Sequence, residues 1–187
     1  LGAVSGAWWH TNTCTDGTPN GYAIFTVKDN SVDDFVYKGT DLDESYQMRI
    51  YNGSQKYTGS KKLTFGWPEE YKGCFIADVF NDDAENWKVE FIQNGVATPM
   101  TRVTKKLRDW CMFAYFINEN GRSPKNTAYH TGKLHYWTLP APCGDPAKEK
   151  NWEIRATYTV PTSGRVNVYT ANSLQVDYTG FPAKLPE

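Results

Sequence analysis

Residues that commonly carry acid–base or metal chemistry are few in this 187-residue chain. Histidine, the usual general base and metal ligand, occurs three times, as His10, His130 and His135. His135 is expected on a strand face, where a packed or exposed side chain is commoner than a metal ligand. No Gly-x-Ser-x-Gly, phosphate-binding or His-Glu-x-x-His motif is present. The sequence therefore indicates no catalytic, cofactor-binding or metal-binding residue.

Acidic residues gather in short turns, which could in principle hold calcium because hard cations take oxygen ligands from such turns. Residues 82–85 form the clearest example, and residues 33–34 and 41–44 are similar. We interpret all three as solvated acidic turns. Asp78 and Asp82 could also form a carboxylate pair for an independent hydrolase. Nothing in their spacing specifically supports that hypothesis.

The most distinctive stretch lies near the N-terminus. A Trp-Trp-His run precedes the segment Asp16-Gly17-Thr18-Pro19-Asn20-Gly21-Tyr22. Asp-Gly and Asn-Gly favour turns and Pro19 fixes its own φ, so the segment predicts a conformationally fixed loop entering a strand. Paired rings beside such a loop could stack on a sugar or a base, whereas the alternative is a hairpin connection with buried tryptophans. The candidate interdomain or ligand contacts are Trp8, Trp9, His10, Asp16, Thr18, Pro19, Asn20 and Tyr22.

The four cysteines, Cys14, Cys74, Cys111 and Cys143, contain no Cys-x-x-Cys pair. A zinc site made of cysteine alone is therefore not indicated. Sequence cannot choose among the three disulfide pairings. Cys74 and Cys111 lie in apolar runs that are typical of buried thiols, and we favour free thiols over a structural bridge.

The composition combines many rings with a balanced charge: 9 Phe, 7 Trp and 12 Tyr accompany 20 basic and 21 acidic residues. A disordered tail would have few aromatic residues and a large net charge. A dedicated nucleic-acid binder would show a basic excess. No apolar run approaches the roughly 20 residues that span a bilayer. Because the chain begins at Leu1, we expect a processed or excised piece of a longer protein, sized for one domain.

Alternation of apolar and polar residues predicts strands along most of the chain. The clearest run is 152–160, and residues 87–91 and 134–138 alternate in the same way. In residues 46–50 the pattern places Gln47 and Arg49 on the wet face. Turn signals such as Asn94-Gly95 separate the runs. Further β-rich runs lie at 22–27, 35–37, 74–80 and 166–170.

One segment breaks this pattern, because apolar residues recur every three or four positions from Val103 to Ala114. That spacing predicts one short helix within residues 103–116. No regular alternation of strands and helices exists, so a parallel sheet is not expected. The fold predicted is mainly all-β: an antiparallel, immunoglobulin-like β-sandwich with long loops and one short helix.

Several of these runs together resemble a known family. Gly6-Ala7-Trp8-Trp9, the loop from Asp16 to Tyr22, Tyr37-Lys38-Gly39 and Gln47-Met48-Arg49-Ile50-Tyr51 are similar to the C-terminal domain of bacterial, Bacteroides-type calcineurin-like metallophosphoesterases. Less specific similarity follows at residues 76–81, 87–90, 135–137 and 154–157. The resemblance covers most of the chain, and residues 140–151 depart from it.

The resemblance implies a parent protein with an N-terminal sandwich-like domain, a central two-metal phosphoesterase domain and this C-terminal domain. The phosphoesterase motifs Asp-x-His, Gly-Asp-x-x-Asp, Gly-Asn-His and Gly-His-x-His are absent from this chain. The two divalent metals are therefore expected in the upstream domain, where they would clamp the attacking and leaving oxygens. No cofactor is expected here, and this chain by itself is not expected to be an enzyme.

We accordingly expect a non-catalytic accessory domain that stabilises or shapes the active-site mouth of the upstream domain of the same polypeptide. Residues 1–38 are expected to pack against that catalytic domain, and residues 39–187 to form the accessory sandwich, although 1–187 could be one unit. The expected partner is the catalytic domain, with no nucleic acid and no membrane span. The resemblance also implies a periplasmic, cell-surface or secreted location.

A carbohydrate-binding module is the alternative, because flat rings on a β-sandwich can stack on sugars. That function predicts two or three exposed, coplanar rings with polar neighbours and a glycan as partner. Buried rings would favour the accessory domain instead. The tryptophans that discriminate between the two are Trp8, Trp9, Trp67, Trp110, Trp137 and Trp152.

Overall fold

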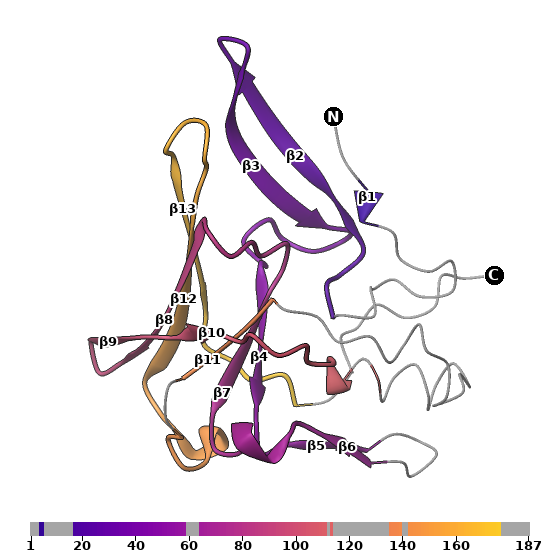
Figure 1. Ribbon diagram of the computed structural model, residues 1–187, viewed down its shortest axis with the longest axis vertical. Coiled ribbons are helices and arrows are strands. Elements are labelled where there is room, and N and C mark those ends of the chain that lie inside the picture. Colours follow the sequence, from indigo (N-terminus) through magenta and orange to yellow (C-terminus); the bar gives the residue numbers. More distant parts are fainter. Residues whose placement is uncertain are drawn as a thin grey trace, which may run out of the picture.

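Antiparallel strands dominate the regular structure in a computed structural model that describes residues 4–5, 17–58, 64–111, 113, 135–139 and 142–176 (Figure 1). Two short 3-10 turns accompany them, η1 (Glu69–Tyr71) and η3 (Pro146–Lys148). The predicted all-β fold of antiparallel sheets is confirmed. Its immunoglobulin-like connectivity stays a prediction.

The first four-stranded sheet has the order β13 (Val166–Ala171), β12 (Trp152–Thr159), β8 (Trp87–Gln93) and β9 (Val96–Pro99). Its inner face follows the predicted alternation, because Ile154 and Ala156 are fully buried whereas Arg155 and Thr157 are half-buried. A two-residue turn, Asn94-Gly95, joins β8 to β9 with φ of 50° and 82°, as such hairpins require.

The second four-stranded sheet has the order β10 (Thr101–Arg102), β11 (Tyr136–Thr138), β7 (Phe75–Val79) and β4 (Met48–Asn52). One face of it packs against the first sheet. Phe75, Ala77 and Val79 meet Val89 and Ile154 in one hydrophobic cluster. The two sheets therefore form a sandwich with a shared core.

The opposite face of the second sheet is also covered. Tyr51, Ile76 and Tyr136 point into a second cluster. It is completed by Val103, Leu107, Cys111 and Phe113 and by the hairpin of β5 (Lys56–Thr58) and β6 (Thr64–Gly66). All five residues of β4 and of β7 are consequently buried. The prediction of a wet face at Gln47 and Arg49 is therefore wrong, since these side chains are only 2% and 4% exposed.

A third sheet consists of β1 (Val4–Ser5), β2 (Gly21–Lys28) and β3 (Ser31–Gly39), and its long hairpin rises beside the β12–β13 hairpin (Figure 1). The β3 side is fastened to that neighbour. Arg165 lies 3.3 Å from Asp34, and Ser163 Oγ donates to the carbonyl of Asp33. The proposed division between residues 1–38 and 39–187 stays a prediction.

The helix predicted within residues 103–116 is wrong over its first half. Residues 103–109 are not helical, and Val103 instead donates its N–H to Tyr136 at the edge of β11. A helical turn begins only at Trp110, with Phe113 donating to the carbonyl of Asp109, and residues 114–116 lie outside the described part. Val103 and Leu107 are both buried, so an irregular connection that enters the core twice produces the same apolar spacing as a helix.

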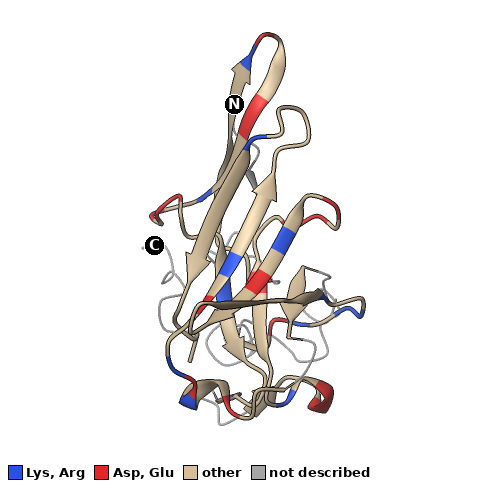
Figure 2. Cartoon of the chain, turned by 90° about the vertical axis from the view of Figure 1, so that its left-hand side faces the viewer, with Lys and Arg blue, Asp and Glu red and all other residues tan. Residues whose placement is uncertain are grey.

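Cys74 and Cys143 are free thiols, as predicted, and burial raises the pKa of Cys143 to about 11. Cys111 is buried in the second cluster, and Cys14 lies outside the described residues. Basic and acidic residues are scattered over the described strands and turns and do not form one large patch of a single sign in this view (Figure 2).

Replacing Ile154 with Ala should test the shared core. Ile154 is fully buried between the sheets, so its truncation should lower the free energy of unfolding by about 2–5 kcal/mol. Val168→Ala on the exposed face of β13 is the control, because Val168 is 54% exposed and should change stability by less than about 0.5 kcal/mol. Urea unfolding measures both, and equal effects would contradict the sandwich.

Candidate functional site

The candidate site is a cluster of charged side chains on the face of the second sheet that is turned away from the first sheet. Arg49 of β4 lies directly opposite Asp78 of β7 in the strand register. His135, which precedes β11, places Nδ1 3.0 Å from Asp78 Oδ1. Asp109 comes from the connection after β10 and accepts a 2.5 Å hydrogen bond from Tyr51 Oη. Two strands, the residue before a third strand and one connection thus bring these groups together.

The loop 17–20 is fastened on top of this cluster by its carbonyl oxygens. Arg49 Nη1 donates to the carbonyl of Gly17, and Tyr37 Oη donates to that of Pro19. The backbone N–H of Thr40 donates to the carbonyl of Asn20 at 2.7 Å. Three anchors in four residues hold the loop in one conformation.

Gly17 shows how closely the loop and the cluster fit. Its φ is +90°, a conformation that side chains rarely adopt. A Cβ atom there would lie 2.6 Å from Asp78 Oδ2 and would also meet Asp109 Oδ2. Both carboxylates therefore approach the loop backbone at one point, and only glycine leaves room for them.

The Arg49 guanidinium is held by rings as well as by charges. It lies 5.9 Å from the ring centre of Tyr46 and 5.4 Å from that of Phe80, distances at which cation–π attraction acts. Nε donates to Tyr46 Oη at 3.0 Å. Burial opposes its charge, but the surrounding tyrosine and aspartate groups outweigh this and raise the pKa of Arg49. Arg49 therefore stays a cation inside the protein.

Tyr51 is the last member of the cluster and contacts Asp109. Burial raises its pKa well above the ordinary value, and the neighbouring Asp109 carboxylate adds to the rise. The phenol therefore keeps its proton and donates a hydrogen bond to Asp109. A charge-assisted bond of this kind is stronger than one between neutral groups.

The cluster is closed to solvent. Arg49, Asp78, Asp109, His135 and Tyr51 are each no more than 9% exposed. Catalytic groups have to touch their substrate, whereas these groups lie beneath the loop and between strands. The arrangement is suited to positioning the loop and not to acid–base chemistry on a bound molecule.

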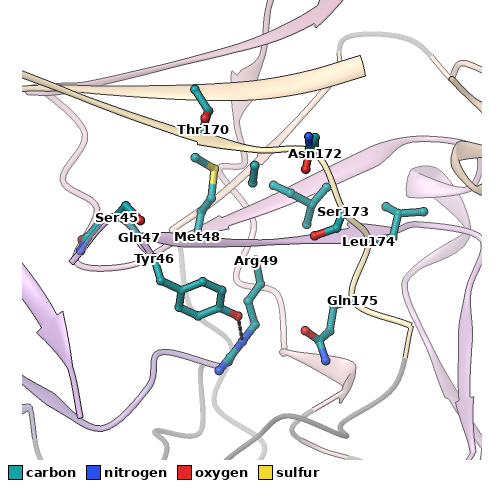
Figure 3. Close-up of a pocket in the computed structure, with 12 residues that line it drawn as sticks. Ser45, Tyr46, Gln47, Met48, Arg49, Thr170, Asn172, Ser173, Leu174 and Gln175 are labelled. Carbon is teal, nitrogen blue, oxygen red and sulfur yellow. Dashed lines mark hydrogen bonds between the residues drawn. The ribbon is translucent and has the colours of Figure 1, made fainter. Parts of the chain in front are cut away.

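A small cleft opens beside Arg49, between residues 45–50 and 170–175 (Figure 3). Its volume is about 200 Å³, smaller than the roughly 300 Å³ at which small-molecule pockets begin. Gln175 donates its N–H to the carbonyl of Ile50 at 2.6 Å, so residues 174–175 cover part of the β4 edge. The cleft is therefore the gap between β4 and the segment that follows β13.

The candidate contact residues are only partly described. Thr18 and Pro19 are buried in the anchored loop, Asn20 is half-buried, and Tyr22 is 41% exposed at the start of β2. Trp8, Trp9, His10 and Asp16 lie outside the described residues.

Sequence reasoning missed the residues that hold the loop, namely Arg49, Asp109 and the pairing of Asp78 with His135. A signal was present for Asp78, because it stands alone among apolar residues in Phe75-Ile76-Ala77-Asp78-Val79-Phe80. A single charge in a run that is otherwise buried requires a buried partner. Arg49 carried no such signal, since simple alternation also explains it.

In the acidic turn at residues 82–85, the carboxylates of Asp82 and Asp83 are bound to other groups of the protein. Asp82 lies 2.6 Å from Arg102 Nε, and burial raises its pKa although Arg102 acts in the opposite direction. Asp83 Oδ1 accepts the backbone N–H groups of Glu85 and Asn86. In the part of the chain that the structure describes, no three His, Cys, Asp or Glu side chains gather as a metal site would require.

Comparison with known proteins identifies the family. The family model for the C terminal of calcineurin-like phosphoesterase matches residues 1–161. The chain therefore belongs to this family of phosphoesterase C-terminal domains, as the resemblance predicted. The match ends shortly after β12, before β13 begins. No significant match was found among curated proteins or among solved structures.

None of the helices in the described ranges is both long enough and apolar enough to cross a membrane.

Substituting Gly17 with Ala should displace the loop. Gly95 is the matched control, because its φ of +82° is similar but a Cβ there meets nothing within 4 Å. Backbone strain alone should cost about 1–2 kcal/mol at either site. Overpacking against the two carboxylates should cost Gly17→Ala roughly 1–3 kcal/mol more. Urea unfolding of both variants measures the difference, and equal losses would contradict the close fit.

Removing the buried cation should be more damaging than removing an exposed one. Arg49→Met leaves Asp78 and Asp109 without their cation and should cost about 3–5 kcal/mol of unfolding free energy. Arg155→Met is the control: Arg155 lies 3.8 Å from Glu153, and the two side chains are 42% and 39% exposed. That exposed pair should contribute no more than about 1 kcal/mol. A loss below about 1 kcal/mol for Arg49→Met would refute the ionic cluster.

Proposed function

We propose that this chain is the non-catalytic accessory domain of a metal-dependent phosphoesterase and that it shapes the active-site mouth of the upstream catalytic domain. The observation that carries the proposal is the loop 17–20, which the buried Arg49 cluster fixes from below. Membership in a family of phosphoesterase C-terminal domains supplies the partner.

The design of the loop supports a role in positioning. A buried ionic cluster costs desolvation energy, and replacing such a cluster with apolar residues often leaves stability unchanged or improves it. Stability alone is therefore a weak reason for placing Arg49 and two carboxylates beneath four loop residues. A loop that must hold one shape against a neighbouring active site is a better reason, because a preorganised surface loses little entropy on contact.

The tryptophans favour this function over sugar binding. Trp67 and Trp137 are 7% and 8% exposed. Trp110 and Trp152 are half-buried and pack against the two core clusters, with Trp152 4.7 Å from Phe75. These four rings therefore pack largely against the core, which favours the accessory domain.

Three further parts of the proposal rest on the family resemblance. Two divalent metals would be held by the upstream domain. Residues 1–38 would form the side that contacts that domain. The parent protein would be exported to the periplasm, the cell surface or the medium.

Deleting residues 16–20 from the full-length protein tests the proposal. The full-length protein should hydrolyse members of a broad panel of phosphomonoesters and phosphodiesters, whereas residues 1–187 alone should not. The deletion should raise KM or lower kcat, because misplacing groups near an active site is costly even without direct contact. We expect a loss of about tenfold in kcat/KM.

The matched pair Gly17→Ala and Gly95→Ala serves as a control in the full-length protein, measured at a temperature where both variants are folded. Only Gly17→Ala should alter the kinetics. Unchanged kcat and KM for the deletion across the whole panel would contradict the proposed role.

A further inference from the structure

Strand β2 has an open edge. On one side it pairs with β3 along its whole length, but on the other it pairs with β1 only at Gly21 and Tyr22. Residues 23–28 therefore have no strand partner on that side within the described part of the chain.

This edge is apolar and, among the described residues, is protected only at its far end. The segment Tyr22-Ala23-Ile24-Phe25-Thr26-Val27 carries no charge. Tyr22, Phe25 and Val27 are 41%, 39% and 67% exposed. Proteins usually shield long apolar edges, because unpaired backbone groups there recruit other strands. Lys28 and a bulge at residues 26–27 protect only the far end.

The register of β1 indicates what covers the edge. Val4 lies opposite Tyr22 and Ser5 opposite Gly21 in an antiparallel pair. If the same register continued towards the N-terminus, position 1 would lie opposite Phe25. The residues that precede position 1 in the parent would then lie opposite residues 26–28.

We propose that β1 is the end of a longer strand, formed by the segment that joins the catalytic domain to Val4, and that this strand covers the β2 edge. The inference rests on the proposed function, since it takes the phosphoesterase domain to lie upstream. The catalytic domain is thereby attached along the β2–β3 hairpin. The opposite side of that hairpin is already held by Arg165 and Ser163. The linker strand therefore joins the catalytic domain to this domain through a β-sheet, and not through a flexible linker.

Paired cysteines in the full-length protein test this register. Leu1→Cys with Phe25→Cys joins residues that would be directly opposite, at a separation that a disulfide can span. Leu1→Cys with Thr26→Cys is the matched control, because a shift of one residue points the second side chain to the other face of the sheet. Mild oxidation followed by peptide mapping identifies the joined residues and separates them from the native cysteines.

The proposal predicts an intramolecular Leu1–Phe25 cross-link that is at least about tenfold more abundant than the Leu1–Thr26 cross-link. Equal cross-linking, no cross-linking, or a cross-link between two molecules would overturn it. If Phe25→Cys impairs folding, Gly2→Cys with Ile24→Cys tests the same register. Phosphoesterase activity of the reduced wild-type protein is measured separately, so that a parent without activity refutes the proposed function and leaves the strand to be judged by the cross-link.

Discussion

Burial of the Arg49 guanidinium is the constraint on which the rest of the site depends. A buried cation is stable only when anions and hydrogen-bond acceptors surround it. Asp78, Asp109 and the carbonyl of Gly17 supply these around Arg49. The strands β4 and β7 bring Arg49 and Asp78 together by register, whereas Asp109 and the loop come from distant parts of the chain. Satisfying one charge thus fixes the relative positions of several elements.

The same constraint ties the loop 17–20 to the second sheet. The second sheet is buried on both faces, by the first sheet on one side and by connections on the other. The loop 17–20 is one of the covering segments, and Tyr37 anchors it again from β3. The loop leads directly into β2, and the open edge of β2 is the one that pairs with β1 at Gly21 and Tyr22. In this chain the fixed loop and the open strand edge thus lie on one continuous segment, residues 17–28.

Much of the fold could be predicted from alternation, because β8 and β12 bury one face against a partner sheet and expose the other to solvent. Alternation failed at Arg49, since it cannot reveal that a second layer covers β4. It failed again at Val103 and Leu107, where an irregular connection reproduces helical spacing. The loop itself was readable from its Gly, Pro and Asn residues. The cluster beneath it was not, because its members are joined by contacts between residues as far apart as Gly17 and Asp109.

The central claim is that the anchored loop serves the catalytic domain, and the most direct test is the kinetics of Tyr37→Phe in the full-length protein. This substitution removes the hydroxyl that donates to Pro19 and leaves every charge in place. Tyr57→Phe is the matched comparison, because it also removes one phenolic hydroxyl, which donates to the carbonyl of Gln175 at 3.3 Å and not to a loop carbonyl. The account predicts a lower kcat/KM for Tyr37→Phe and a wild-type value for Tyr57→Phe. Equal kcat/KM in both variants, with amide hydrogen exchange of residues 17–20 accelerated only in Tyr37→Phe, would contradict it.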